Sequence, residues 1–108
     1  MERNEKVYQV IIASDANGRM YDHFEFLARV SVNAASRLLD ELLKDIRNLP
    51  TEPFRYPVYN RPYLTVDKYR YILSNKRYRI VYQIIGNQVF VDDIQACRQD
   101  DDKSILNK

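Results

Sequence analysis

Hydrophobic and polar positions alternate with two different periods along the chain, which predicts that it forms both strands and helices. Residues 7–13 are rich in β-branched and aromatic side chains and predict a first strand. Apolar residues then recur at three- and four-residue steps, which predicts two amphipathic helices, over residues 17–30 or 19–30 and over residues 31–48. Ser31 is a suitable cap for the second helix, and Pro50 stops it. The joint between them is very short, so we expect a helical hairpin.

The second half of the chain predicts a long loop followed by three strands. Residues 51–67 hold three of the four prolines and predict the loop, which in a compact domain is often functional. Three β-prone segments follow, at residues 68–74, 78–85 and 89–97. Gly86-Asn87 is a two-residue hairpin signal, and Asn75-Lys76 is a weaker one. The order predicts an α+β fold: an N-terminal strand, a helical hairpin and a three-stranded antiparallel meander, with the helices on one sheet face.

Length and composition fit one small globular domain covering residues 1–108. Hydrophobic residues make up 45% of the chain, which argues against disorder. No apolar run approaches the roughly 20 residues that span a bilayer, and the polar N-terminus predicts no secretory signal. Cys97 is the only cysteine, so no internal disulfide can form, and we expect a cytoplasmic protein that does not bind membranes.

The net charge of +2 says little about partners, but the distribution of charge says more. Between Phe54 and Tyr82 lie seven basic residues, one acidic residue and eight of the thirteen aromatic residues. Cations interleaved with planar rings suit phosphate contact together with base stacking. The alternative is a tyrosine-rich strand core with solvated charges on its rim. On the first interpretation, nucleic acid would contact Lys68, Lys76, Arg77 and Gln83.

A strand register converts this distribution into a surface. If both predicted turns have two residues, Arg79 faces Ile72 on one side and Ile94 on the other, and directly opposed residues share a sheet face. The predicted seat of the helices then carries Tyr69, Tyr71, Leu73, Tyr78, Ile80, Tyr82, Ile84, Val89 and Val91. The opposite face carries Lys68, Arg70, Arg79 and Arg98, with Gln83 and Asp92 between them. Asp93 falls on the apolar face and does not fit. A purely structural alternative is that Arg79 or Arg98 pairs with Asp92.

Three short segments occur in the order and spacing of a known family. They are Tyr78-Arg79-Ile80-Val81-Tyr82-Gln83-Ile84, then Val89-Phe90-Val91-Asp92-Asp93-Ile94, then Cys97-Arg98-Gln99-Asp100. With the predicted element order, they resemble the RelE/ParE superfamily of toxins from bacterial type II toxin–antitoxin modules, plasmid-stabilisation members included. The resemblance covers nearly the whole chain and implies a toxin that a small antitoxin holds in check.

The resemblance implies two different mechanisms. The RelE branch cleaves mRNA in the ribosomal A site, whereas the ParE branch inhibits DNA gyrase and is not known for catalysis. Arg79 and Arg98 match the RelE arginines that bind phosphate and stabilise charge at the scissile group, and Arg70 matches a basic residue on the preceding strand. These three are the catalytic residues that the resemblance implies.

The match to a ribonuclease is incomplete. Ile72 stands at the second basic position of its strand, and no tyrosine follows Tyr82, although a catalytic tyrosine would fall near Ser104. His23, the only histidine, is expected on the first helix. Lys68 could take the 2′-hydroxyl proton only if its pKa were strongly lowered. We nevertheless expect a toxin that acts on mRNA at the ribosome through its basic sheet face, as an mRNA endoribonuclease would. The alternatives are a non-catalytic inhibitor of DNA gyrase and a decayed toxin that only binds its antitoxin.

We expect no metal and no cofactor, because one cysteine and one histidine cannot make a zinc site and two glycines cannot make a phosphate loop. The expected partner is an acidic, amphipathic antitoxin segment that folds on binding, in addition to ribosome and mRNA or DNA gyrase. Such a segment can add a strand at a sheet edge, which would be residues 89–97 or residues 7–13.

Overall fold

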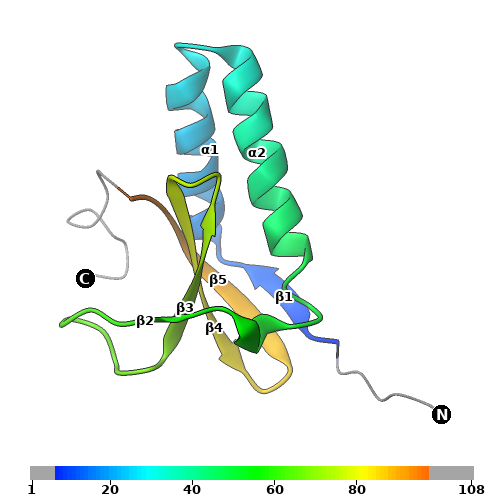
Figure 1. The fold of residues 1–108 in the computed structure, drawn as a ribbon, viewed down its shortest axis with the longest axis vertical. Coiled ribbons are helices and arrows are strands. Elements are labelled where there is room, and N and C mark those ends of the chain that lie inside the picture. Colours follow the sequence, from blue (N-terminus) through cyan, green and yellow to red (C-terminus); the bar gives the residue numbers. More distant parts are fainter. Residues whose placement is uncertain (1–6, 98–108) are drawn as a thin grey trace.

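The computed structural model describes residues 7–97, which form two helices and a five-stranded sheet (Figure 1). The elements in chain order are β1 (Gln9–Ile12), α1 (Ser14–Ala28), α2 (Val32–Arg47), the 3₁₀ turn η1 (Pro53–Arg55), β2 (Val58–Tyr59), β3 (Tyr69–Ser74), β4 (Tyr78–Ile85) and β5 (Gln88–Ala96). The predicted α+β class, with a strand, a helical hairpin and an antiparallel meander, is confirmed. The predicted loop also contains the short strand β2, and Arg98 lies outside the described residues.

The sheet has the strand order β1-β5-β4-β3-β2. β1 runs parallel to β5, and the other neighbouring strands are antiparallel. The expectation that β5 offers a free edge is wrong, because β1 pairs with it over residues 88–91. β1 and β2 are the edge strands, so the expectation of an edge at the first strand is confirmed.

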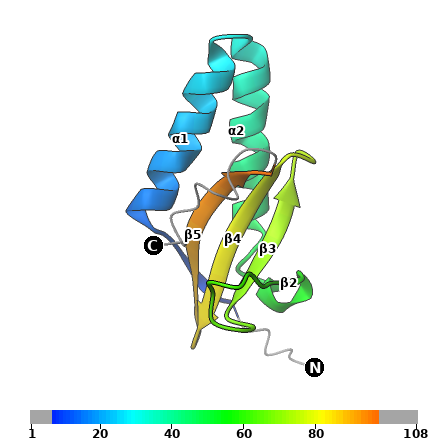
Figure 2. The same cartoon turned by 90° about the vertical axis from the view of Figure 1, so that its left-hand side faces the viewer.

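The helical hairpin packs on one face of the sheet, and its closed end extends past the strands (Figures 1 and 2). Ser31 caps α2 by accepting a hydrogen bond from the Ala34 backbone N–H at 3.1 Å, as its position predicts. α1 begins at Ser14, earlier than predicted. α1 lies along β5, which brings its polar side chains close to that strand.

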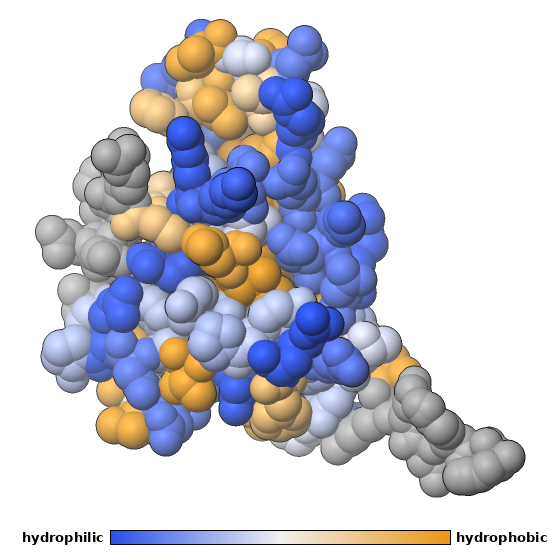
Figure 3. Space-filling view, viewed as in Figure 1, coloured by the Kyte–Doolittle hydropathy of each residue, from blue (hydrophilic) through white to orange (hydrophobic). Residues whose placement is uncertain are grey.

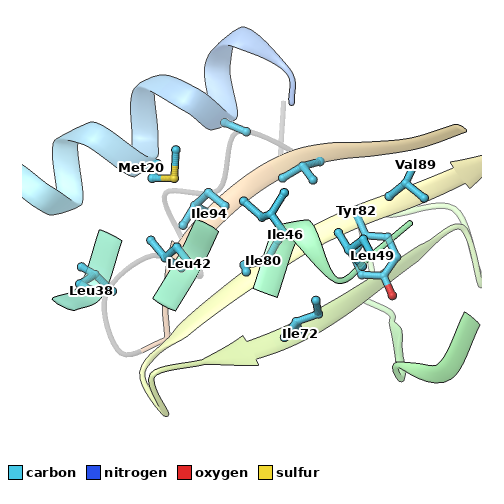
Figure 4. Packing of buried hydrophobic residues seen from close by; sticks show 12 residues of the cluster. Met20, Leu38, Leu42, Ile46, Leu49, Ile72, Ile80, Tyr82, Val89 and Ile94 are labelled. Carbon is cyan, nitrogen blue, oxygen red and sulfur yellow. The ribbon is translucent and has the colours of Figure 1, made fainter. Parts of the chain in front are cut away.

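The core lies between the hairpin and the sheet (Figure 4). The apolar stripe of α2 faces β-branched and aromatic residues of the strands, and both sides are fully or nearly fully buried. The labelled members in Figure 4 are Met20, Leu38, Leu42, Ile46, Leu49, Ile72, Ile80, Tyr82, Val89 and Ile94. Each such side chain contributes about 1.5–3 kcal/mol by leaving water. The predicted helix seat is therefore confirmed for Ile80, Tyr82, Val89 and Val91.

The predicted faces of β3 are wrong, because the turn before β4 is followed by one extra residue. Asn75 and Lys76 have φ values of 52° and 60°, as the two central residues of a type I′ turn require. Ser74 then pairs with Tyr78 rather than with Arg77, so Arg79 lies opposite Leu73. A one-residue shift moves every side chain of a strand to the other face. Tyr69, Tyr71 and Leu73 therefore lie on the face away from the helices, and Arg70 lies on the helix side.

A β-bulge between β4 and β5 corrects the second half of the register. The pairing shifts between Val81 and Tyr82, so that Asp92 has no direct partner on β4. Ile94 consequently faces Ile80 and joins the core, and Asp93 faces Val81 on the other side. The misfit of Asp93 on the apolar face is thereby removed.

Candidate functional site

The sheet face that points away from the helices, called the open face below, carries a second, smaller apolar cluster. Tyr59, Tyr69 and Val81 are buried there, and Leu64 and Tyr71 pack against them. The two-residue strand β2 brings Tyr59 opposite Tyr69, and the ladder places both beside Val81 and its neighbours. Tyr69 and Tyr71, which the predicted register places beneath the helices, thus belong to this second cluster on the opposite face.

Two guanidinium groups lie over the ring of Tyr59. The Cζ atom of Arg61 is 4.4 Å from the ring centroid, and that of Arg79 is 5.4 Å from it. Both distances are within the range of attractive cation–π contacts. Burial raises the pKa of the Tyr59 hydroxyl, and the two arginines oppose this rise. Tyr59 therefore stays protonated and donates its hydroxyl to Oε1 of Gln95 at 3.1 Å.

A buried polar network connects this face to α1. Oε1 of Gln95 also accepts a hydrogen bond from Nε of Arg79 at 3.1 Å, and its Nε2 donates to Oδ2 of Asp93 at 3.0 Å. Oδ1 of Asp93 accepts from the Ile94 backbone N–H at 2.9 Å and lies 3.2 Å from Nε of Arg19. Asp93 and Gln95 are both 0% exposed, so their charges and dipoles act in a low-dielectric environment.

The topology explains why an α1 residue reaches this network. β1 pairs only with residues 88–91 of β5, and α1 packs along β5. Arg19 can therefore approach Asp93. The sequence did not single out Arg19 or Gln95 as members of a polar network. The available signal was that Gln95 interrupts an otherwise apolar strand end.

The other end of the open face brings together two of the predicted nucleic-acid-binding residues. Gln83 donates from Nε2 to Oδ2 of Asp92 at 2.6 Å, and Nζ of Lys68 lies 5.3 Å from the centroid of the Tyr69 ring. Burial raises the pKa of Asp92, while the hydrogen bond from Gln83 and the charge of Lys68 act against the rise. Asp92 is thus a carboxylate that the protein partly desolvates.

Arg70 does not join Arg79. Its Nη1 donates to the Tyr56 carbonyl oxygen at 2.6 Å and to that of Phe54 at 3.3 Å, and its guanidinium lies 5.3 Å from the Phe54 ring centroid. Tyr82 donates to the Pro53 carbonyl oxygen at 2.6 Å, and burial raises the pKa of the Tyr82 hydroxyl. These contacts hold η1 against the helix side of the sheet, so the predicted grouping of Arg70 with Arg79 on one face is wrong.

Lys76 and Arg77 lie at a different place, beside a hollow of about 370 Å³ between the helical hairpin and the β3–β4 turn. The hollow is lined by the cations of Arg37, Lys76 and Arg77, by Glu41, and by apolar side chains that include Leu27 and Tyr78. The predicted nucleic-acid-binding residues are therefore divided between this hollow and the open face.

His23 lies between α1 and β5. Its Nε2 is 2.8 Å from the Ile94 carbonyl oxygen, and its ring meets the Tyr78 ring edge-to-face at 5.2 Å. The histidine therefore joins the helix to the sheet on the core side, away from the open face. Residues 7–97 contain no group of three or more His, Cys, Asp or Glu side chains that could hold a metal ion. Within the same range, neither helix has the length and apolar character that crossing a membrane requires.

Comparison with known proteins gives a family match and a similar fold. A family model described as "ParE toxin of type II toxin-antitoxin system, parDE" matches residues 10–101. A chain in the solved structure of the chromosomal ParDE TA system from P. aeruginosa superposes with a TM-score of 0.67. It is 10% identical, and the match covers 83% of this chain and 96% of that chain. No curated protein sequence matches the chain.

Proposed function

The chain belongs to the ParE toxin family of type II toxin–antitoxin systems, and we propose that it acts by binding DNA gyrase rather than by cutting mRNA. The family match supports this choice, because the ParE branch of the superfamily is the one that inhibits gyrase. An antitoxin partner belongs to the same toxin–antitoxin context.

The observation that carries the proposal is that the proton-accepting groups on the open face are already buried, ion-paired or hydrogen-bonded within the protein. Asp93 is buried and paired with Arg19, Asp92 accepts a hydrogen bond from Gln83, and Tyr59 has a raised pKa. A ribonuclease of the RelE kind needs a group that takes the 2′-hydroxyl proton next to the phosphate-binding cations. Among residues 7–97, each of these candidates already serves the fold. The open face, with Arg61 and Arg79 over Tyr59, suits contact with a macromolecule better than acid–base catalysis.

We place the antitoxin at the hollow beside the β3–β4 turn. Three cations and one anion line it together with apolar side chains, which complements an acidic, amphipathic segment. Apolar side chains are also exposed at the closed end of the hairpin, where Figure 3 shows them gathered. They are Phe26, Val30 and Val32, which are 61%, 81% and 64% exposed. A segment that is disordered alone could fold on this surface and bury them.

Cleavage of mRNA is the second candidate. The cations of Arg61, Lys68 and Arg79 lie against tyrosine rings, an arrangement that also suits phosphate contact and base stacking. On this alternative Arg79 keeps the phosphate-binding role that the resemblance implies. Arg98, the other arginine of that set, remains a prediction outside the described residues.

Induction of the chain in bacterial cells separates the two functions. The topology of a reporter plasmid, the rate of translation and the integrity of mRNA are followed from the first minutes. We expect loss of negative supercoiling while mRNA stays intact. Prompt arrest of translation with cut mRNA and normal supercoiling would instead support the ribonuclease. Normal growth with neither effect would overturn both.

A further inference from the structure

We infer that Gln95 is a positioning residue that fixes the guanidinium of Arg79 on the open face. Gln95 is fully buried, so it cannot be a contact for gyrase itself. It acts through the hydrogen bond from Nε of Arg79 to its Oε1. The inference about activity rests on the proposed function, whereas the orientation of Arg79 can be measured without it.

The hydrogen bond from Gln95 to Asp93 sets the orientation of the Gln95 amide. An amide can present either its oxygen or its nitrogen to a neighbour, and the surrounding network decides which. Nε2 of Gln95 donates to Asp93, and a carboxylate can only accept, so Oε1 must point the other way. Oε1 is therefore available to accept from Arg79.

Asp93 is in turn held in one position. One of its oxygens receives the Ile94 backbone N–H and lies 3.2 Å from Nε of Arg19, and the other receives Gln95. Two residues of β5 and one of α1 thus form a rigid support behind Arg79. The buried hydrogen bonds of Asp93 and Gln95 restrict these two side chains to one arrangement.

The support matters because an arginine side chain has many rotamers. The Nε–H bond to Gln95, together with the ring of Tyr59 5.4 Å from Cζ, restricts the plane in which the guanidinium lies. A group that is already ordered loses less conformational entropy when a partner binds. Gln95 therefore raises the affinity of the open face for its target without touching it.

The competing interpretation is that Gln95 only fills space and satisfies Tyr59. Both roles predict a less stable protein when Gln95 is changed, so stability cannot distinguish them. The difference lies in the Nε–H of Arg79, which the hydrogen bond to Gln95 protects from exchange with water if Gln95 positions the guanidinium.

The test uses the full chain made by cell-free synthesis with ¹⁵N-labelled arginine, and NMR measures the exchange rate of the Arg79 Nε–H. Two variants are compared. Gln95→Asn keeps an amide but shortens its reach by one methylene, and Tyr59→Phe removes the other hydrogen bond to the same oxygen. We expect exchange to become at least about tenfold faster in Gln95→Asn and to change less than about twofold in Tyr59→Phe. Equal exchange rates in the wild type and in Gln95→Asn would overturn the inference.

If Gln95→Asn does not fold, Gln95→Met is measured in the same way, since its volume is close to that of glutamine. If neither folds, the double variant Arg19→Met with Asp93→Leu is used, which removes the acceptor that orients the Gln95 amide and should also speed exchange; no change there overturns the inference. A supercoiling assay gives a second test. Gln95→Asn should weaken the inhibition of gyrase when Arg79 is present, but should cause no further loss in a chain that already carries Arg79→Ala. If the double variant instead loses inhibition by the product of the two single-variant factors, Gln95 only fills space. Faster exchange in a chain that does not inhibit gyrase would reject the proposed function and keep the positioning role.

Discussion

Nη1 of Arg70 donates to the Tyr56 carbonyl oxygen at 2.6 Å, which ties η1 to β3. The same nitrogen also contacts the Phe54 carbonyl oxygen. A residue that the family resemblance places among the catalytic arginines thus has a structural role in the described chain. Its role in activity stays a prediction. Its contacts give the competing expectation that Arg70 stabilises the fold, which denaturation can measure.

Arg70→Ala should destabilise the fold by about 2 kcal/mol, because two carbonyl oxygens lose a charged donor. Urea denaturation measures the change. The matched control is Arg55→Ala in the same loop, which removes an exposed ion pair with Glu52 and should cost less than about 0.5 kcal/mol. An Arg70→Ala protein that is as stable as the wild type but inactive would show instead that Arg70 contacts the target.

The buried ion pair of Arg19 and Asp93 should behave non-additively. Arg19→Met leaves a carboxylate that is 0% exposed without the guanidinium 3.2 Å away, and we expect a loss of about 3 kcal/mol. The double variant Arg19→Met with Asp93→Leu removes both charges and should be more stable than Arg19→Met alone. Denaturation of the single and double variants gives the coupling energy. A double variant whose loss equals the sum of the two single losses would show that the two side chains do not interact.

Asp92 should make the fold less stable as the pH rises from acid toward neutral. Burial raises the pKa of the folded carboxyl above its unfolded value, so the folded state binds the proton more tightly. The resulting stabilisation is fully present below about pH 4, the usual pKa of an aspartate, and disappears as the pH passes the folded pKa. Asp92→Asn should flatten this dependence while keeping an acceptor for Gln83.

Denaturation of the wild type, Asp92→Asn and Asp40→Asn between pH 3.5 and 7 checks the sign. Asp40 is an exposed carboxylate on α2, so Asp40→Asn is the control for the loss of one negative charge. If Asp92→Asn keeps the full pH dependence of the wild type, another group is responsible for it.

Most of the fold followed from the sequence, because periodicity and turn residues act locally. The bounds of β3, β4 and β5 were predicted to within one residue, and Ser31 was recognised as a helix cap. The faces of β3 were not predicted, because a single extra residue at Arg77 reverses them. No local pattern distinguishes a two-residue turn from the same turn followed by one unpaired residue.

The candidate site was only partly predictable, for a different reason. Arg79 and Gln83 were assigned to the open face, and their ladder positions confirm it. The network behind Arg79 depends on Arg19, which lies far from β5 in the chain and reaches it only through the packing of α1. Contacts of that kind arise from tertiary structure, so the pattern of hydrophobic and polar positions along the sequence does not predict them.

The most direct test of the central claim is a supercoiling assay with purified gyrase, relaxed plasmid and the purified chain. We expect the wild type to inhibit supercoiling, Arg79→Ala to inhibit at least about tenfold more weakly, and Arg47→Ala, which removes an exposed cation at the end of α2, to inhibit like the wild type. Translating ribosomes incubated with the same preparations should keep their mRNA intact. Unimpaired supercoiling together with cleaved mRNA would contradict the claim that the chain acts on gyrase.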